Sequence, residues 1–345
     1  MTRAVLASVL ALAGLMTCAG DNGRYPGLHV AGNKLVDRYG HAIRLLGVNR
    51  AGAEYACLQG HPPLGGPADR RAIAAMTAWR INAVRVPLNE QCWLGINGAP
   101  AGYSKAHYRA AIKRYVSRLH QAHLYVVLDL HWSAPGLTKA QGQQAMADFD
   151  HAPAFWRSVA RTFKRDHAIA FDLYNEPHDI TWKCWRDGCR LDEGWRTAGM
   201  QTLVDAVRST GAVAPIIATG IDWGSDLSSW SKYKPDDPTD QLAAGLHVFD
   251  FADCASLGCW KSTVAGVARK VPVVATEFGQ RDCAAAFMER FMDWADAAGV
   301  SYLGWSWNPF GCAGPALVDS WDGRPTPAGR QLRARLLRLD ASRVR

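Results

Sequence analysis

The sequence lacks the marks of a nucleotide-binding, membrane-spanning or nucleic-acid-binding protein. No G-x-G-x-x-G loop follows an early apolar strand, so the open sheet of a dinucleotide-binding fold is not indicated. No apolar segment after the first twenty residues is long enough to cross a bilayer. The net charge of +8 has no nucleic-acid-binding motif behind it, and the arginines of residues 330–345 are interleaved with leucines as on the exposed face of a last helix. We therefore expect no cofactor, no nucleic-acid partner and no transmembrane helix in the mature chain.

The first twenty residues have the organisation of an export signal. Arg3 supplies a positive start, Ala4–Met16 is an apolar stretch too short to span a bilayer, and Thr17-Cys18-Ala19 offers small residues for cleavage. We predict a signal peptide at residues 1–20, one domain at residues 21–345, and a secreted or periplasmic protein. Two alternatives stay open: an uncleaved apolar N-terminus, and a lipid anchor at Cys18, because the residues before it resemble a bacterial lipobox.

Eight cysteines remain when Cys18 is set aside, and an even number in an exported chain indicates disulfide bonds. Their pairing is open at this point, because eight cysteines allow about a hundred connectivities. The spacings Cys184-x4-Cys189 and Cys254-x4-Cys259 differ from the paired spacing of a zinc site, so we expect no metal. The eight are Cys57, Cys92, Cys184, Cys189, Cys254, Cys259, Cys283 and Cys312.

Apolar, β-branched runs alternate with segments of helical period along the chain. A hairpin around residues 38–41 leads into a first strand that ends at Val48-Asn49. Seven further strands are predicted at residues 81–88, 125–132, 168–175, 215–221, 242–249, 271–277 and 301–307. Three helical faces are predicted from Tyr108, Ile112, Tyr115, Leu119 and His123, from Phe155, Val159 and Phe163, and from Phe287, Phe291, Trp294 and Ala298. Eight such repeats without a linker predict one closed (β/α)8 TIM barrel with an N-terminal β-hairpin.

Polar residues gather where the predicted strands end, which is the catalytic face of such a barrel. Each has an ordinary structural explanation when taken alone, such as packing or a buried ion pair. Together they form a constellation, because independent structural needs would scatter them over both ends of the barrel. They are Arg85, His131, Asn175, Glu176, His247, Glu277, Trp305 and Trp307.

Two glutamates carry the mechanism that this pattern predicts. Glu176 follows the fourth strand and Glu277 ends the seventh, so the two face each other across the mouth of a ring of eight strands. Glutamates reaching inward from there could approach to about 5–5.5 Å, the separation of the pair in a retaining glycosidase. One would attack the anomeric carbon while the other protonates the leaving oxygen, which requires their pKa values to differ.

These residues resemble glycoside hydrolase family 5, the cellulase-type family of retaining β-glycosidases, over the whole mature chain. The resemblance rests on Arg85, His131, Asn175-Glu176-Pro177, His247, the run from Thr276 to Gly279, and Trp305. It implies that Glu176 is the acid/base and Glu277 the nucleophile. It further implies that Asn175 binds the sugar 2-hydroxyl, that Arg85 keeps Glu277 ionised, that both histidines orient substrate and tune Glu176, and that Trp305 is the floor of the subsite.

One position departs from the family pattern. The family usually has a tyrosine two residues after the sixth-strand histidine, and its hydroxyl donates to the nucleophile. Here the run is His247-Val248-Phe249, so that donor is missing. We expect a raised pKa of Glu277, and a slower reaction or a shifted acid limb rather than an inactive protein.

Aromatic residues after strand ends are expected to form sugar platforms, because an aromatic face stacks on a pyranose ring. The candidates are Trp132, Trp182, Trp185, Trp223, Trp305 and Trp307, whereas Trp79, Trp156 and Trp294 lie on predicted helices and are assigned to the core. The eight cysteines also follow strands, which suggests the pairs Cys57–Cys92, Cys184–Cys189, Cys254–Cys259 and Cys283–Cys312 as staples of the binding loops.

Two other classes of function stay open. One is a sugar-binding barrel without catalysis, and the other is a metal-dependent hydrolase that uses Asp129, His131 and His247. Within the leading class we expect a monomer that acts on a β-linked polysaccharide or oligosaccharide. β-1,4-Glucan is the first choice by family frequency; mannan, xylan, mixed-linkage glucan and β-glucosides, and endo or exo action, are left open.

Overall fold

A closed barrel of eight parallel strands forms the centre of the protein. The computed structural model describes residues 27–343, so the predicted signal peptide and Cys18 lie outside the described residues. The strands follow the order β10-β11-β4-β5-β6-β7-β8-β9 around the barrel, and every neighbouring pair is parallel. They are β4 (Leu46–Asn49), β5 (Ala83–Asn89), β6 (Tyr125–Trp132), β7 (Ile169–Asp172), β8 (Ile216–Thr219), β9 (Leu242–Phe249), β10 (Val273–Gly279) and β11 (Ser301–Gly304). The predicted (β/α)8 barrel is confirmed.

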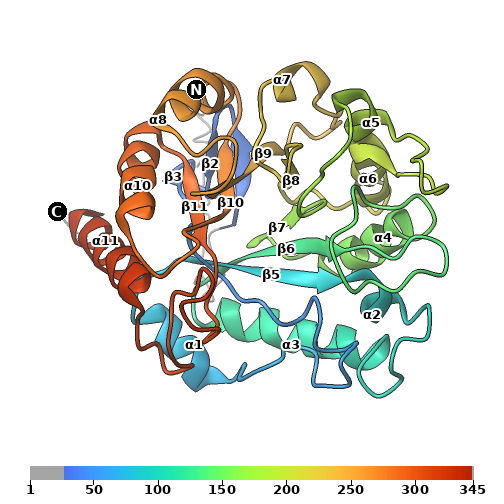
Figure 1. The fold of residues 1–345 in the computed structure, drawn as a ribbon, viewed down its shortest axis with the longest axis horizontal. Coiled ribbons are helices and arrows are strands. Elements are labelled where there is room, and N and C mark those ends of the chain that lie inside the picture. Colours follow the sequence, from blue (N-terminus) through green and yellow to red (C-terminus); the bar gives the residue numbers. More distant parts are fainter. Residues whose placement is uncertain (1–26, 344–345) are drawn as a thin grey trace, which may run out of the picture.

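Helices surround this barrel and connect successive strands (Figure 1). In α4, Phe155, Val159 and Phe163 are buried as their spacing predicted. Two other predicted face residues are exposed: His123 lies beyond the end of α3 with φ near 58°, and Ala298 is the last residue of α10. The longer helices are α1 (Arg70–Thr77), α3 (Ala106–Gln121), α4 (Ala152–Phe163), α6 (Gly199–Arg208), α10 (Ala286–Ala298) and α11 (Pro327–Arg343).

Short helices occupy several of the segments that follow strands. They are α2 (Glu90–Leu94), α5 (Trp182–Asp187), α7 (Trp230–Tyr233), α8 (Leu257–Cys259), the π-helix η1 (Trp260–Val264) and α9 (Ala265–Ala268). Within residues 27–343, no helix combines the length and the apolar character that crossing a bilayer requires.

A small antiparallel sheet covers one end of the barrel. It consists of β1 (His29–Ala31), β2 (Lys34–Val36) and β3 (Ala42–Ile43), so the predicted hairpin is present with one additional strand. Leu28 and Leu35 pack with residues at the starts of barrel strands, among them Ala83 and Tyr125, in a cluster separate from the main core. Apolar packing therefore closes the end of the barrel where the strands start. A functional site is expected at the opposite end, where the strands finish.

Four disulfides connect the segments that follow the strands. They join Cys57 to Cys92, Cys184 to Cys189, Cys254 to Cys259, and Cys283 to Cys312. This is the pairing that the positions of the cysteines suggested. The first and last disulfides link loops that follow adjacent pairs of strands, β4 with β5 and β10 with β11.

Candidate active site

The strand ends bring the predicted polar residues into one cluster. Glu277 lies on β10 directly beside His247 of β9, after a register irregularity between Ala275 and Glu277 that turns the end of the strand. Glu176 follows β7, which ends at Asp172, three residues earlier than predicted. One carboxylate oxygen of Glu176, one of Glu277 and one ring nitrogen of His247 lie within 4.8 Å of one another. The predicted face-to-face arrangement of the two glutamates is present.

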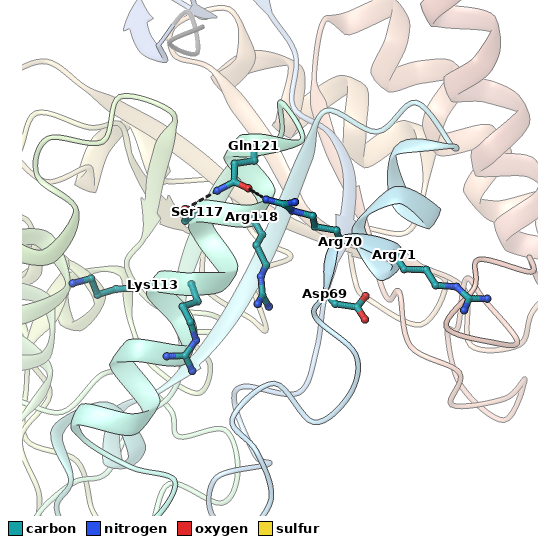
Figure 2. A pocket seen from close by; sticks show the side chains of 8 residues that line it. Asp69, Arg70, Arg71, Lys113, Ser117, Arg118 and Gln121 are labelled. Carbon is teal, nitrogen blue, oxygen red and sulfur yellow. Dashed lines mark hydrogen bonds between the residues drawn. The ribbon is translucent and has the colours of Figure 1, made fainter. Parts of the chain in front are cut away.

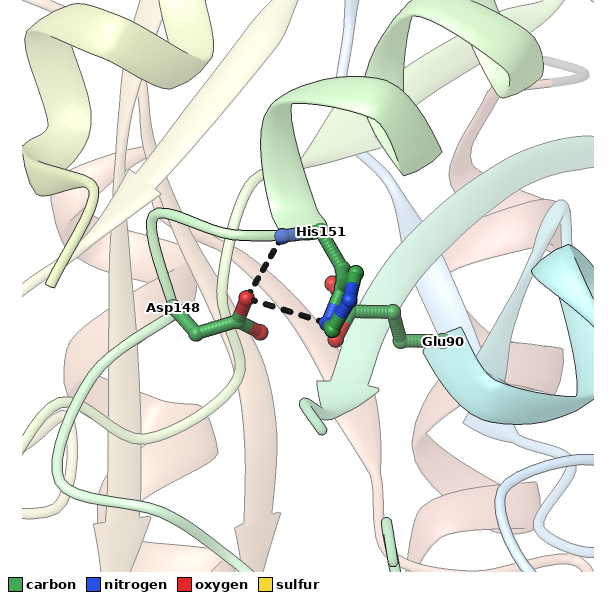
Figure 3. Close-up of side chains that lie close together, drawn as sticks. All are labelled: Glu90, Asp148 and His151. Atoms are coloured by element: carbon green, nitrogen blue, oxygen red, sulfur yellow. Dashed lines mark hydrogen bonds and ion pairs between the residues drawn. The ribbon is translucent and has the colours of Figure 1, made fainter. Parts of the chain in front are cut away.

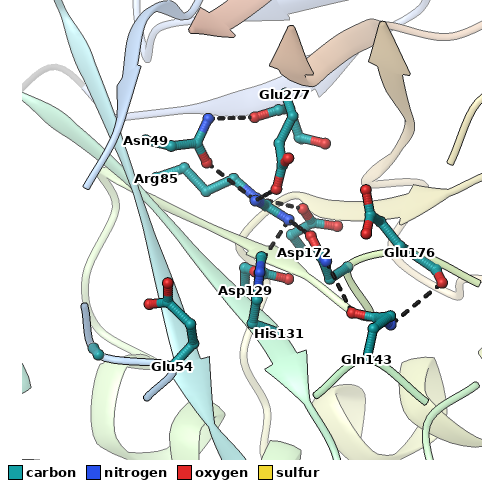
Figure 4. Close-up of polar contacts among 12 residues, drawn as sticks. Asn49, Glu54, Arg85, Asp129, His131, Gln143, Asp172, Glu176 and Glu277 are labelled. Carbon is teal, nitrogen blue, oxygen red and sulfur yellow. Dashed lines mark hydrogen bonds and ion pairs between the residues drawn. The ribbon is translucent and has the colours of Figure 1, made fainter. Parts of the chain in front are cut away.

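Arg85 is the centre of the network beneath these glutamates (Figure 4). Its guanidinium is fully buried and donates to Glu277 Oε1 at 2.6 Å, to Asp172 Oδ2 at 2.9 Å and to Asn175 Oδ1 at 2.8 Å. It also pairs with Asp129 Oδ2 at 3.0 Å. Burial opposes the charge, but the three carboxylates together raise the pKa of Arg85. The arginine is therefore a permanent cation fixed against Glu277.

Two buried aspartates share this cation. Asp129 of β6 and Asp172 of β7 are register partners on adjacent strands. Burial raises the pKa of each to about 7, although Arg85 opposes the shift. Asp172 was not predicted as a site residue, and Asp129 was predicted only as a candidate metal ligand. A carboxylate inside an otherwise apolar barrel strand, one or two strands away from a strand that carries an arginine, was the signal for both.

The two glutamates have different surroundings. Burial raises the pKa of Glu277, against the lowering effects of His247 and Arg85, and the direct contact with the guanidinium favours its ionised form. Burial also raises the pKa of Glu176, which has no such contact; its Oε1 lies 2.9 Å from Nδ1 of His247. One carboxyl group is thus held against a cation and the other against an imidazole.

Both predicted histidines belong to the site. Burial lowers the pKa of His247 to about 3, so its ring is neutral at neutral pH. His131 Nδ1 lies 2.7 Å from Asp129 Oδ2, and the ring is stacked on Trp305 at 5.6 Å between centroids.

Phe249 is buried and stacks on Phe251, so no phenolic hydroxyl reaches Glu277 from this position.

The tryptophans that follow strand ends divide into exposed or partly exposed residues and buried ones. Trp132 and Trp305 are partly exposed beside His131, and Trp223 is 50% exposed and stacks on His178 at 3.7 Å. The predicted binding role of Trp307 is wrong. Its side chain is fully buried against Trp79, with ring centroids 4.7 Å apart, because the chain after β11 turns this residue into the layer beneath α1. Trp185 is fully buried as well, and Trp182 packs against it.

Three further residues of this region were missed by sequence reasoning. Glu54 is buried in the loop after β4, and its Oε2 accepts a hydrogen bond from Gly52 N at 2.6 Å. Gln143 contacts Asn175 and the backbone of Glu176, and His178 supports Trp223. Glu54 and Gln143 lie in long loops without a periodic pattern, so only their place after a strand could have indicated them.

The donor set does not favour the alternative metal site. In the described residues, Asp129, His131 and His247 do not bring three ligand atoms within 4.8 Å of one another, and Asp129 Oδ2 is paired with Arg85 and His131 Nδ1 instead. Elsewhere, Glu90, Asp148 and His151 form a second cluster of possible ligands (Figure 3). His151 Nδ1 lies 2.9 Å from the carbonyl oxygen of Ala134.

A surface groove of about 690 Å³ lies apart from this site, between α1 and α3 (Figure 2). Its lining is rich in cationic side chains and contains a single carboxylate, Asp69, whose Oδ1 caps the backbone of Ala72 at 2.9 Å. A groove of this composition offers no carboxylate pair, so the strand ends of the barrel are the candidate active site.

Comparisons with known proteins agree with this geometry. A family model described as Cellulase (glycosyl hydrolase family 5) matches residues 36–311. A mannan endo-1,4-beta-mannosidase of Streptomyces lividans is 24% identical over 333 residues, which cover 94% of this chain and 76% of that protein. Endoglucanase 1 of Saitozyma flava is 25% identical over 61% of each chain. A beta-glucanase from Saccharophagus degradans, solved in complex with cellotetraose, superposes with a TM-score of 0.71 at 19% identity, covering 91% of this chain and 93% of that one.

Proposed function

The chain belongs to glycosyl hydrolase family 5, and from that premise we propose that it is an exported, retaining endo-β-1,4-glucanase. That the protein is a glycosyl hydrolase follows from the family; the substrate, the stereochemistry and the roles of individual residues are the proposal. The observation that carries it is the pair Glu176 and Glu277, with carboxylate oxygens within 4.8 Å and only Glu277 bonded to Arg85. That separation fits a double displacement, since an inverting pair lies about 6.5–9.5 Å apart to admit a water molecule.

In the first step, Glu277 attacks the anomeric carbon while Glu176 donates its proton to the glycosidic oxygen. The bond to the leaving group breaks and a covalent glycosyl ester with Glu277 forms. In the second step, Glu176 takes a proton from water, which attacks the same carbon and releases Glu277. Burial, which raises the pKa of Glu176, favours the protonated form that the first step requires.

The remaining residues bind and orient the sugar in this proposal. Asn175 is 1% exposed and presents its amide beside Glu176, where it can bond to the 2-hydroxyl as the oxocarbenium-like state develops. Trp305, stacked on His131, forms the floor for the sugar whose bond is cleaved. Trp223, held flat against His178, extends the platform on the side of Glu176.

Glucan is the first candidate substrate, because the family model is the cellulase model and similar solved structures include an endo-beta-1,4-glucanase and an endoglucanase. Mannan is the second, because the mannosidase of Streptomyces lividans aligns with 94% of this chain. A panel of β-glucan, mannan and xylan with sizing of the products separates these candidates and distinguishes endo from exo cleavage.

The mechanism is tested by labelling and by substitution. A 2-deoxy-2-fluoro glycoside with an activated leaving group should label Glu277 covalently, and peptide mapping identifies the ester. Glu277→Gln should abolish turnover, whereas Glu193→Gln, a change at an exposed glutamate, should leave it unchanged. Absence of label in wild-type protein that binds the sugar would instead support the non-catalytic barrel.

Export and the monomeric state complete the proposal. The four disulfides fit an oxidising compartment. Mass spectrometry of the mature N-terminus distinguishes cleavage near residue 20 from lipidation at Cys18, and light scattering measures the oligomeric state.

A further inference from the structure

The loop after β6 runs beside the turn that carries the catalytic asparagine and glutamate. Tyr174 donates its hydroxyl to the carbonyl oxygen of Gln144 at 2.7 Å, and His178 N donates to the carbonyl oxygen of Ala145 at 2.9 Å. Between these two anchors, the side chain of Gln143 reaches the turn itself (Figure 4). The loop and the turn are therefore joined on both sides of the catalytic residues.

The orientation of each amide in this contact follows from Arg85. A guanidinium can only donate, so the atom of Asn175 that lies 2.8 Å from Arg85 must be its oxygen. The other end of Asn175 is then its nitrogen, which donates to Gln143 Oε1 at 2.9 Å. This leaves the Gln143 nitrogen to donate to the carbonyl oxygen of Glu176 at 3.2 Å. One cation thus fixes the direction of three consecutive hydrogen bonds.

One N–H group of the Asn175 amide remains available to a ligand. The Asn175 amide has two N–H groups and one oxygen. Arg85 occupies the oxygen and Gln143 accepts from one N–H, so one N–H remains. Asn175 is almost completely buried, so this remaining donor has a fixed direction when substrate arrives.

We infer that Gln143 is a positioning residue for the reaction: it holds the Asn175 amide so that its remaining N–H meets the sugar 2-hydroxyl. The inference deepens the proposed function and rests on it. Gln143 acts through Asn175 and touches no reacting atom. Because the 2-hydroxyl contact strengthens as the transition state forms, loss of Gln143 reduces kcat more than it raises KM.

The test pairs two variants with two substrates. The substrates are an aryl β-glycoside that the wild type hydrolyses and its analogue without the 2-hydroxyl on the sugar to be cleaved. Gln143→Ala should lower kcat/KM about tenfold on the first substrate, the size of one lost hydrogen bond, and less than about twofold on the second. Gln144→Ala, which removes the neighbouring amide side chain, should change neither by more than about twofold.

Gln143→Glu separates positioning from a general structural role. Its carboxylate still accepts from Asn175, so the preference for the 2-hydroxyl should be retained. Its charge beside Glu176 should raise the pKa of that acid and move the basic limb of the pH–rate profile to higher pH.

Equal losses for Gln143→Ala on both substrates, or loss of the 2-hydroxyl preference in Gln143→Glu, overturn the inference while leaving the proposed function intact. A wild-type protein that hydrolyses no glycoside overturns the proposed function, and the inference with it.

Discussion

The buried carboxyl pair of Glu90 and Asp148 makes the stability of this enzyme depend on pH in a specific direction. Glu90 lies in α2 and is fully buried, and its Oε2 accepts a hydrogen bond from Ala134 N at 2.6 Å. Asp148 Oδ2 accepts from the same N–H at 3.3 Å. Burial, and then the charge of Asp148, raise the pKa of Glu90 well above its ordinary value. A hydrogen bond between the protonated Glu90 side chain and Asp148 raises the pKa of Glu90 further.

The sign of the effect follows from the raised pKa. The neutral form is favoured in the folded protein, so the contribution of Glu90 is complete below the unfolded pKa, near 4.5. It is lost as the pH rises from there to the folded pKa, because folding must then take up a proton. The loss is about 1.4 kcal/mol for each pH unit in this interval. Glu90→Gln keeps an N–H donor for Asp148 and does not titrate, so it escapes this loss.

Urea unfolding of wild type and Glu90→Gln between about pH 4 and pH 8 measures the difference directly. The free energy of unfolding of wild type should fall relative to that of the variant by about 1.4 kcal/mol per pH unit, and the slope should flatten at the folded pKa. Glu193→Gln, an exposed control, should show no such slope. A difference between wild type and Glu90→Gln that stays constant with pH would refute the shared proton.

Three further predictions concern the site and its supports. Phe249→Tyr restores the phenolic donor that the family pattern directs at Glu277, the proposed nucleophile, so the pKa of Glu277 should fall and the acid limb of kcat/KM should move down by about 1–2 pH units; an unchanged profile contradicts this. Trp305→Ala should lower kcat/KM about tenfold with little effect on stability, whereas Trp307→Ala should cost about 3–5 kcal/mol of unfolding free energy; calorimetry beside kinetics checks both. Replacing Cys57 and Cys92 by alanine should cost about 4 kcal/mol, from a loop that spans 35 residues, and denaturant unfolding that shows no loss would contradict loop-closure entropy as the cause.

The barrel was predictable because every strand reads as an apolar run between turn signals. The predicted ends of the strands were less accurate than their positions. At β7 the regular ladder stops at Asp172. Backbone hydrogen bonds from Leu173 N to Ile217 O and from Asn175 N to Leu130 O nevertheless continue along the neighbouring strands. A sequence pattern that predicts an extended chain does not show where the ladder of a twisted barrel stops. The disulfides were predictable from their place after strands, since adjacent loops offer few partners.

The residues that were missed share a different cause. Gln143 and Glu54 lie in loops whose paths depend on tertiary contacts. Those contacts leave no periodic pattern in the sequence from which they could be predicted. The error at Trp307 has the same origin. Trp305 and Trp307 are two residues apart after the same strand, but the chain no longer follows a strand there, so alternation does not apply. Packing against Trp79 decides the position instead.

Because Phe249 replaces the tyrosine of the family pattern, the charges around Arg85 become important for stabilising an ionised Glu277. Three carboxylates contact this one buried cation, and a dry barrel cannot hold three negative charges against one positive charge. Burial raises the pKa of Asp129 and Asp172 to about 7, so near neutral pH a proton on either aspartate reduces the negative charge that competes with Glu277 for the guanidinium. With a phenylalanine where a phenolic donor would stand, the hydrogen bond from Arg85 to Glu277 Oε1 is the cationic contact that favours an ionised Glu277. The two aspartates beneath the site therefore affect how far Arg85 stabilises an ionised Glu277, the proposed nucleophile, although both aspartates are fully buried.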